Sequence, residues 1–356
     1  MKVAIITDTH WGARNDSLNF IDYYEKFYRD TFFPTLDKEV IDTVLMLGDT
    51  FDRRKYINFV TWNKAKSIYF DQLAKRNIQT YILVGNHDTS YKNTNKINSP
   101  DLLLREYTNI QVIDEPTTID VKDTAICMMP WICPENYSDS IQTIKETDAE
   151  ICMGHLEISG FAMHRGMKSE EGLSRDLFRK FDMVFSGHYH HRSTQDNISY
   201  LGNPYELTWQ DHGDPRGFHI FDLSDRTLEF VENTNIMFHR IVYDDKENTI
   251  SQITSKDLSQ YKNTYVKVVV INKTNPYLFD QFMINLYNND PIDVTIAEDF
   301  VDLTENLEDD KIDEAEDTIT IINKFVDAVE YENIDNKRLK NILKELYVEA
   351  LNTEQA

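Results

Sequence analysis

The sequence lacks the features that mark exported, membrane-spanning and disulfide-stabilised proteins. No apolar run is long enough to cross a bilayer, and the chain begins with a strand-like segment, Met1–Ile6, in place of a signal sequence. Only three cysteines occur (Cys127, Cys133 and Cys152), and no CxxC pair indicates a structural zinc site. We therefore expect a cytoplasmic protein, with no membrane partner, whose thiols are reduced and buried.

Positive charge is also scarce. The chain has 37 Lys and Arg residues against 61 Asp and Glu residues, a net charge of −24, whereas nucleic-acid-binding proteins are usually basic. The acidic excess is uneven, because residues 298–332 contain 14 acidic residues and two lysines, which is half of the net charge. The remaining body is only moderately acidic. Charge therefore neither supports nor excludes a nucleic-acid partner.

The chain of 356 residues is long enough for two or three domains. Apolar strands alternate with helical patterns between residues 2 and 84, which predicts a βαβαβ run, a mostly parallel sheet and an α/β fold class. Short β segments then prevail from Tyr205 to Asn272 and predict a small second domain. The predicted parts are a first domain, a capping domain, an acidic linker and a terminal helical segment: 1–204, 205–297, 298–317 and 318–356.

Two kinds of apolar stripe leave alternatives open. Aromatic side chains recur at helical spacing in residues 20–28 and 59–70, where they fit either the core or a subunit contact. Residues 321–329 and 339–351 predict amphipathic helices that either dock on a partner or fold back on the body.

Ligand-type side chains follow five of the predicted strands. One strand ends at Gly48, which permits a tight turn and delivers Asp49 at the carboxyl end, where ligands gather in open α/β sheets. A single such residue is most simply a turn former or a hydrogen-bonded histidine. Five clusters of oxygen and imidazole donors instead predict a metal site. The collected residues are Asp8, His10, Asp49, Asn86, His87, His155, His188 and His190.

These clusters read DxH, GDxxD, GNHD, GH and GHxH in chain order. As a set they resemble the calcineurin-like metallophosphoesterase superfamily over residues 1–204. The resemblance implies a two-sheet β sandwich flanked by helices (αββα), a small α+β capping domain and C-terminal helices.

The same resemblance implies two divalent metal ions. Asp8, His10 and His190 would hold one ion. Asn86, His155 and His188 would hold the other, with Asp49 bridging both. Imidazole, carboxylate and amide donors without thiolate favour Mn²⁺, with Mg²⁺ and Fe²⁺ as the alternatives.

The resemblance also suggests catalytic roles beside the ligands. His87 would protonate the leaving oxygen as a general acid, and Asp52 would orient His87. The alternative for Asp52 is a surface residue without a catalytic role. Asp88 is expected to support the turn.

Protein phosphatases of the superfamily typically read GDxxDRG and GNHE, whereas this chain has Asp52-Arg53-Arg54 and ends its third cluster with Asp88. The order of its parts resembles SbcD-type double-strand-break repair nucleases. Segments such as Asp214–Phe218 look like the nuclease component of recombination complexes of large tailed phages. If a phage encodes the chain, its location is the infected bacterial cell.

That family implies a Mn²⁺-dependent double-strand exonuclease with single-strand endonuclease activity, which acts in recombination and double-strand-break repair. The expected partners are DNA, a second copy of the chain through the aromatic stripes, and an SMC-like coiled-coil ATPase that binds the C-terminal helices. The alternatives are a small-molecule phosphodiesterase or protein phosphatase and, more remotely, a non-catalytic scaffold on the same fold.

Several cations near the predicted site are candidates for holding backbone phosphates, although each fits a solvated loop equally well. They are Arg53, Arg54, Lys55, Lys92, Lys96, Arg165 and Lys168.

Overall fold

The computed structural model describes residues 1–164, 167–168, 172–246 and 257–297, with the backbone alone for 162–164 and 167–168. These residues belong to one compact unit, Met1–Glu298. The predicted linker and terminal helices lie outside the described residues. Within the described part, no helix is long and apolar enough to cross a membrane.

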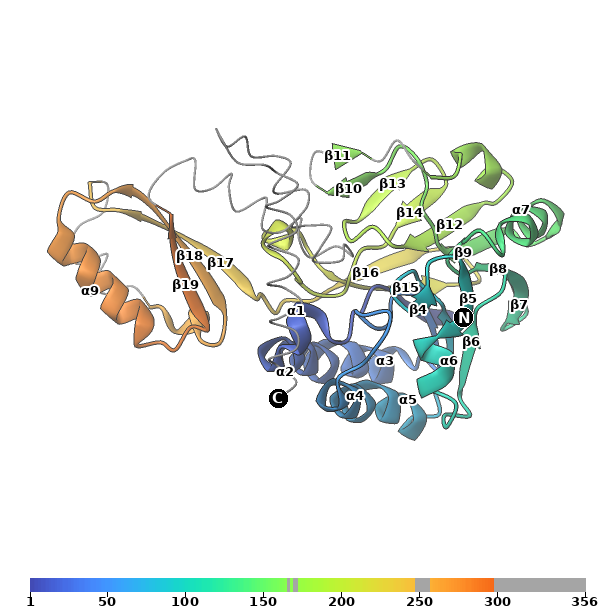
Figure 1. Ribbon diagram of the computed structural model, residues 1–356, viewed down its shortest axis with the longest axis horizontal. Coiled ribbons are helices and arrows are strands. Elements are labelled where there is room, and N and C mark those ends of the chain that lie inside the picture. The colour runs from blue at the N-terminus through green and yellow to red at the C-terminus, as the bar shows by residue number, and fades with distance from the viewer. Residues whose placement is uncertain (165–166, 169–171, 247–256, 298–356) are drawn as a thin grey trace, which may run out of the picture. The chain divides into compact units, whose positions relative to one another are not determined.

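Two six-stranded sheets form the centre of the fold (Figure 1). The first sheet has the order β16 (Leu228–Glu232), β15 (Gly217–Asp222), β1 (Lys2–Ile6), β2 (Thr43–Met46), β3 (Gln79–Leu83) and β6 (Ile110–Ile113). The second has the order β13 (Ser193–Gln195), β14 (Ile198–Tyr200), β12 (Met183–Gly187), β9 (Ile151–His155), β8 (Thr124–Met129) and β7 (Thr117–Val121). Strands β1, β2, β3 and β6 run parallel, as do β14, β12, β9 and β8. The predicted parallel core is thus confirmed.

Three apolar layers stack through this unit. Successive strand residues point to opposite faces of a sheet. Leu45 therefore packs with Met153 in the layer between the two sheets. Its neighbour Met46 packs with Tyr24 in the layer between the first sheet and its covering helices. On the outer face of the second sheet, Cys152 packs with Ile144 of α7. The covering helices are α2 (Leu18–Phe27), α3 (Phe33–Glu39), α4 (Phe59–Ala65), α5 (Asp71–Lys75) and α7 (Tyr137–Glu146). This order of layers is the predicted αββα sandwich.

Smaller elements connect these layers. They are α1 (Ala13–Asp16), β4 (Thr89–Tyr91), β5 (Thr94–Asn98), α6 (Ser99–Leu103), β10 (Ala162–His164), β11 (Met167–Lys168) and 3₁₀ turns at Arg175–Phe178, Trp209–Asp211 and Ser259–Tyr261. Two π-helical turns, Tyr28–Phe32 and Lys66–Phe70, continue α2 and α4.

The aromatic stripe of residues 20–28 belongs to the core. Tyr24, Phe27 and Tyr28 are fully buried, and Tyr24 stacks on Tyr205 with ring centroids 3.8 Å apart. The alternative of a subunit contact through this stripe is therefore wrong. The stripe of residues 59–70 belongs only partly to the core. Its second half is buried, whereas Phe59 at its start is 86% exposed.

A separate three-stranded parallel sheet follows, with the order β17 (Phe238–Asp244), β18 (Tyr265–Asn272) and β19 (Asp293–Ala297). Helix α9 (Pro276–Tyr287) packs on it (Figure 1). We call β17–β19 with α9 the cap. The predicted domain boundary at residue 205 lies too early in the chain. Strands β15 and β16 fall within the predicted capping domain but belong to the first sheet, where β15 pairs antiparallel with β1.

Candidate metal centre

The predicted ligands lie where parallel strands of both sheets end. Asp8 and His10 follow β1, Asp49 follows β2 and Asn86 follows β3, which are neighbours in the first sheet. His155 ends β9 and His188 follows β12, its neighbour in the second sheet. Because the carboxyl ends of parallel strands share one edge of a sheet, these side chains converge.

Asp8, His10 and His190 form the first group. Their ligand atoms all lie within 4.8 Å of one another. The Nε2 atoms of His10 and His190 are 3.2 Å apart, and each lies 4.0 Å from Asp8 Oδ1. Asp8 and His10 are buried. Two imidazole nitrogens and a carboxylate that converge at this spacing form a donor set suited to a divalent cation.

Asn86, His155 and His188 form the second group. Asn86 Oδ1 lies 2.9 Å from His155 Nε2 and 3.0 Å from His188 Nδ1. Nδ1 of the buried His155 contacts the Leu47 carbonyl at 2.8 Å, which places the proton on Nδ1 and leaves the Nε2 lone pair for a ligand.

Asp49 faces both groups. Its Oδ2 lies 3.2 Å from His155 Nε2 and 3.9 Å from His10 Nε2, while its Oδ1 accepts the backbone N–H of His87 at 2.8 Å. Burial favours the neutral acid, but His155 and His87 hold the pKa of the Asp49 carboxyl well below its usual range. An ionised carboxylate between two histidine-containing groups fits the predicted bridging position.

The backbone at these strand ends is unusual. Asp8, His10, Asp49 and His188 have φ values of 53°, 41°, 49° and 86°, a region that non-glycine residues rarely adopt. A Cβ at Gly187 would lie 2.0 Å from Thr7 Oγ1, so only glycine fits there. Such conformations persist only where surrounding contacts hold them.

His87 and Asp52 differ in detail from the prediction. His87 Nδ1 donates to the main-chain carbonyl of Asp52 at 2.7 Å, whereas the Asp52 carboxylate lies 3.3 Å from His10 Nδ1. Burial lowers the pKa of His10, but Asp52 and Asp49 outweigh it and raise that pKa to about 9. Asp52 therefore contacts His87 through its backbone and His10 through its side chain.

Asp88 supports the turn, as predicted. Its carboxylate accepts the backbone N–H groups of Gly85, Phe51 and Thr50 at 2.9, 3.0 and 3.2 Å. Burial and the neighbouring Asp49 raise the pKa of Asp88 to about 7. This carboxyl thus fastens the loop after β3 to the loop after β2.

The candidate DNA-contacting cations differ in how far other residues of the chain engage them. Arg53 is tied to Asn15, Asp16 and Tyr56, and Lys96 is paired with Glu135. Lys55 and Lys92 are exposed. Arg54 donates a hydrogen bond to the Thr89 hydroxyl at 3.2 Å. Burial lowers the pKa of the Arg54 guanidinium, and the nearby Asp49 carboxylate offsets part of this effect. The side chains of Arg165 and Lys168 lie outside the described residues.

One aromatic side chain at the site was not predicted. The ring of Trp131 lies 5.2 Å from that of His188 and 6.1 Å from that of His155, between centroids. The only sequence signal is its position two residues after β8, the strand beside β9. Trp131 supports the imidazole pair of the second group.

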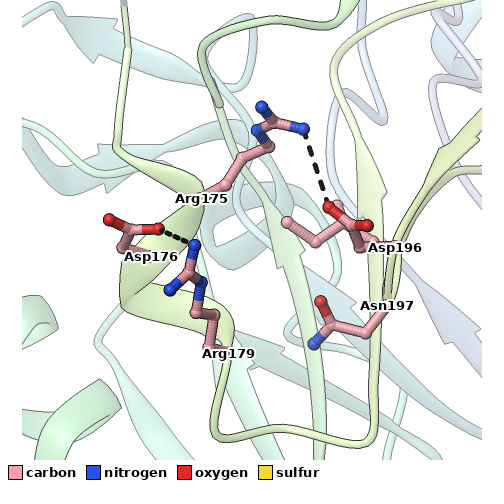
Figure 2. Close-up of a pocket in the computed structure, with 6 residues that line it drawn as sticks. Arg175, Asp176, Arg179, Asp196 and Asn197 are labelled. Carbon is pink, nitrogen blue, oxygen red and sulfur yellow. Dashed lines mark ion pairs between the residues drawn. The ribbon is translucent and has the colours of Figure 1, made fainter.

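A cavity of about 290 Å³ lies elsewhere in the unit. Figure 2 shows its two ion pairs, Arg175 with Asp196 and Arg179 with Asp176. Asn197, also in its lining, directly precedes β14, which runs parallel to β12. The cavity therefore lies at the opposite end of these strands from His188 and has no part in the metal centre.

Comparisons with known proteins agree with this geometry. The family model of calcineurin-like phosphoesterases matches residues 1–192. Exonuclease subunit 1 of Enterobacteria phage T4 is 32% identical over 98% of this chain and 99% of its own length. An SbcCD nuclease component of Staphylococcus saprophyticus is 21% identical over 97% of both chains. The DNA double-strand break repair protein Mre11 of Methanocaldococcus jannaschii is 24% identical over 99% of this chain and 96% of its own.

The matched family model covers the strand ends that carry all the converging side chains described above. The similarity to the phage exonuclease extends over nearly the whole of both proteins. The chain therefore belongs to the calcineurin-like phosphoesterase family, whose members hydrolyse phosphoester bonds with two divalent metal ions, and within it to the group that contains these nucleases.

Proposed function

We propose that this protein is a Mn²⁺-dependent DNA nuclease of recombination and double-strand-break repair. It would act as an exonuclease on double-stranded DNA and as an endonuclease on single strands. The observation that carries the proposal is the convergence of two groups of donor side chains around Asp49, beside His87. The names of the relatives, an exonuclease subunit and break-repair nucleases, support DNA as the substrate.

In the proposed assignment, Asp8, His10 and His190 hold one ion, Asn86, His155 and His188 hold the other, and Asp49 contacts both. Bound there, divalent ions would neutralise the phosphate and lower the pKa of the attacking water. The protein itself supplies the proton for the leaving group. The Nδ1–H of His87 donates a hydrogen bond to the Asp52 carbonyl, so the imidazolium form of His87 would protonate the leaving oxygen from Nε2.

Arg54 is the cation best placed to hold the DNA backbone at the site. Arg54 is part-buried, and the Asp49 carboxylate attracts its charge, whereas Lys55 and Lys92 are exposed. Arg53 and Lys96 are engaged by neighbouring residues of the chain. We therefore rank Arg54 first among the phosphate-binding candidates.

The proposal includes two protein partners. An SMC-like ATPase would bind the C-terminal helices of residues 318–356, consistent with relatives that are named as subunits. A second copy would dock on the exposed apolar surface of Tyr56, Phe59 and Val60, which are 64%, 86% and 53% exposed. Phe59 and Val60 begin the stripe of residues 59–70, which is the second predicted dimer contact, whereas the stripe of residues 20–28 is buried.

Degradation of end-labelled double-stranded DNA in Mn²⁺ tests the substrate, with Asp49→Ala as the inactive control and a nitrophenyl phosphodiester as a small substrate. Loss of nucleotide release in the variant supports the proposal. Cleavage of the small diester without DNA cleavage, even with the ATPase added, overturns the choice of DNA. Efficient hydrolysis of nitrophenyl phosphate monoesters with DNA left intact favours the phosphatase alternative.

His87→Ala tests the general-acid assignment. The variant should retain both metal affinities, because its ring is not among the proposed ligands, and lose about 10²–10⁴-fold in turnover. Metal binding by calorimetry and single-turnover DNA cleavage measure the two effects. A variant that turns over at the wild-type rate contradicts the assignment.

A further inference from the structure

The loop between β14 and β15, residues 201–216, lies beside the metal centre without contributing a ligand. It is densely buried, with Tyr205, Glu206, Asp211 and Arg216 each no more than 5% exposed. Burial of charged residues is costly unless each finds partners. The hydrogen-bond partners of these buried side chains include the turns that carry the proposed metal ligands.

Arg216 holds the turn that carries His190. Its Nη1 donates to the main-chain carbonyl of His190 and to Asn203 Oδ1. Its Nη2 donates to Asp211 Oδ1 at 2.6 Å and lies 3.0 Å from Asp214. The two carboxylates neutralise and orient the guanidinium, because a planar fork keeps its geometry when both ends are engaged.

Tyr205 holds the turn that carries Asp8 and His10. Its hydroxyl donates to the carbonyl of Thr9, the residue between those two ligands. The Tyr205 ring is itself fixed by stacking on Tyr24. Because Asp8 and His10 both adopt positive φ, the turn between them requires such an outside contact to persist.

We propose that Arg216 and Tyr205 are positioning residues for one of the two metal sites, the one formed by Asp8, His10 and His190. This inference rests on the ligand assignment under the proposed function. Both side chains act on main-chain carbonyls within the ligand-bearing turns. Groups that orient metal ligands typically contribute 10–100-fold to metal affinity.

The effect is selective for that site, because the second group is held by other contacts. Nδ1 of His155 donates to the Leu47 carbonyl, and the ring of His188 packs on Trp131. Neither contact involves the loop of residues 201–216. Loss of the Tyr205 and Arg216 hydrogen bonds should therefore weaken one ion and spare the other.

Titration of the full-length protein with Mn²⁺, followed by calorimetry and by the paramagnetic signal of free Mn²⁺, tests this inference. Tyr205→Phe removes one hydroxyl and keeps the stacked ring. It should weaken one of two binding events by about tenfold and leave the other unchanged. Tyr107→Phe is the matched control, since Tyr107 is also a buried tyrosine and its hydroxyl donates to Asp71, away from the site.

Arg216→Lys and Arg216→Met form the second pair. The lysine variant should recover part of the affinity that the methionine variant loses, because an ammonium can still donate to the His190 carbonyl. Unchanged affinities in Tyr205→Phe, or equal weakening of both sites, overturn the inference. Two intact Mn²⁺ sites with a selective Tyr205→Phe effect uphold it even if DNA proves not to be the substrate.

Discussion

Glu206 is a buried carboxyl whose ionisation should limit the stability of the protein above neutral pH. It is 5% exposed, and its Oε2 accepts the backbone N–H groups of Met237 and Phe238 at 2.6 and 2.9 Å, where the cap begins. Burial outweighs these two hydrogen bonds and raises the pKa of Glu206 from 4.5 to about 7. Glu206→Gln keeps an oxygen acceptor for both N–H groups and removes the charge.

The direction of the effect follows from proton linkage. Below about pH 4.5 the carboxyl is protonated in both the folded and unfolded states. Between pH 4.5 and 7 the folded state retains a proton that the unfolded state has lost, so the free energy of unfolding falls as pH rises. The full difference corresponds to about 3 kcal/mol, reached above about pH 7.

Glu206→Gln should therefore match the wild type near pH 4.5 and exceed its free energy of unfolding by up to about 3 kcal/mol at pH 8. Denaturant unfolding of both proteins from pH 4.5 to 8 measures the difference, in which all other titrating groups cancel. Glu229→Gln, an exposed position on β16, is the matched control. A Glu206→Gln variant that parallels the wild type at every pH, or is less stable at pH 8, refutes the reasoning.

Three further predictions address the site and the partners. Gly187→Ala places a Cβ 2.0 Å from Thr7 Oγ1 and should weaken Mn²⁺ binding at least about tenfold by calorimetry; wild-type affinity would show that the strand end can relax. Phe59→Asp should convert a dimer to a monomer in light scattering, with the exposed Tyr137→Asp as control, and a persistent dimer would move the contact elsewhere. Deletion of residues 318–356 should abolish co-purification with the ATPase and preserve Mn²⁺ binding; a surviving complex would exclude the tail as the docking segment.

The strand-end side chains could be predicted from sequence because the pattern is local. An apolar strand, a glycine and a ligand-type residue lie within a few positions of one another, as at Leu47-Gly48-Asp49. The structure brings all seven predicted ligand residues into two adjoining groups. The atoms that Asp52 uses could not be predicted, since the choice between its carboxylate and its carbonyl depends on how the loop after β2 turns.

Non-local pairing limited the rest of the prediction. Strand β15 has the same short apolar pattern as a cap strand, and only its register with β1, more than 200 residues away, places it in the first sheet. Helix α9 was not predicted because it is apolar on both faces. It buries Leu278, Phe282 and Leu286 but exposes Tyr277 and Ile284, so no single stripe stands out.

The rate at which the buried cysteines react with an alkylating reagent can be used to measure local opening of the second sheet. Cys127 and Cys152 face each other in register on β8 and β9 and are fully buried, and Cys133 is 4% exposed. The hydrogen bond with Cys127 and burial hold the pKa of the Cys152 thiol well above its usual value, so reaction with an alkylating reagent requires the strand to open. Because Cys152 lies three residues before His155 on the same strand, its alkylation rate measures how often that ligand strand separates. Bound metal ions should slow the reaction in proportion to the stability that they add to the closed form.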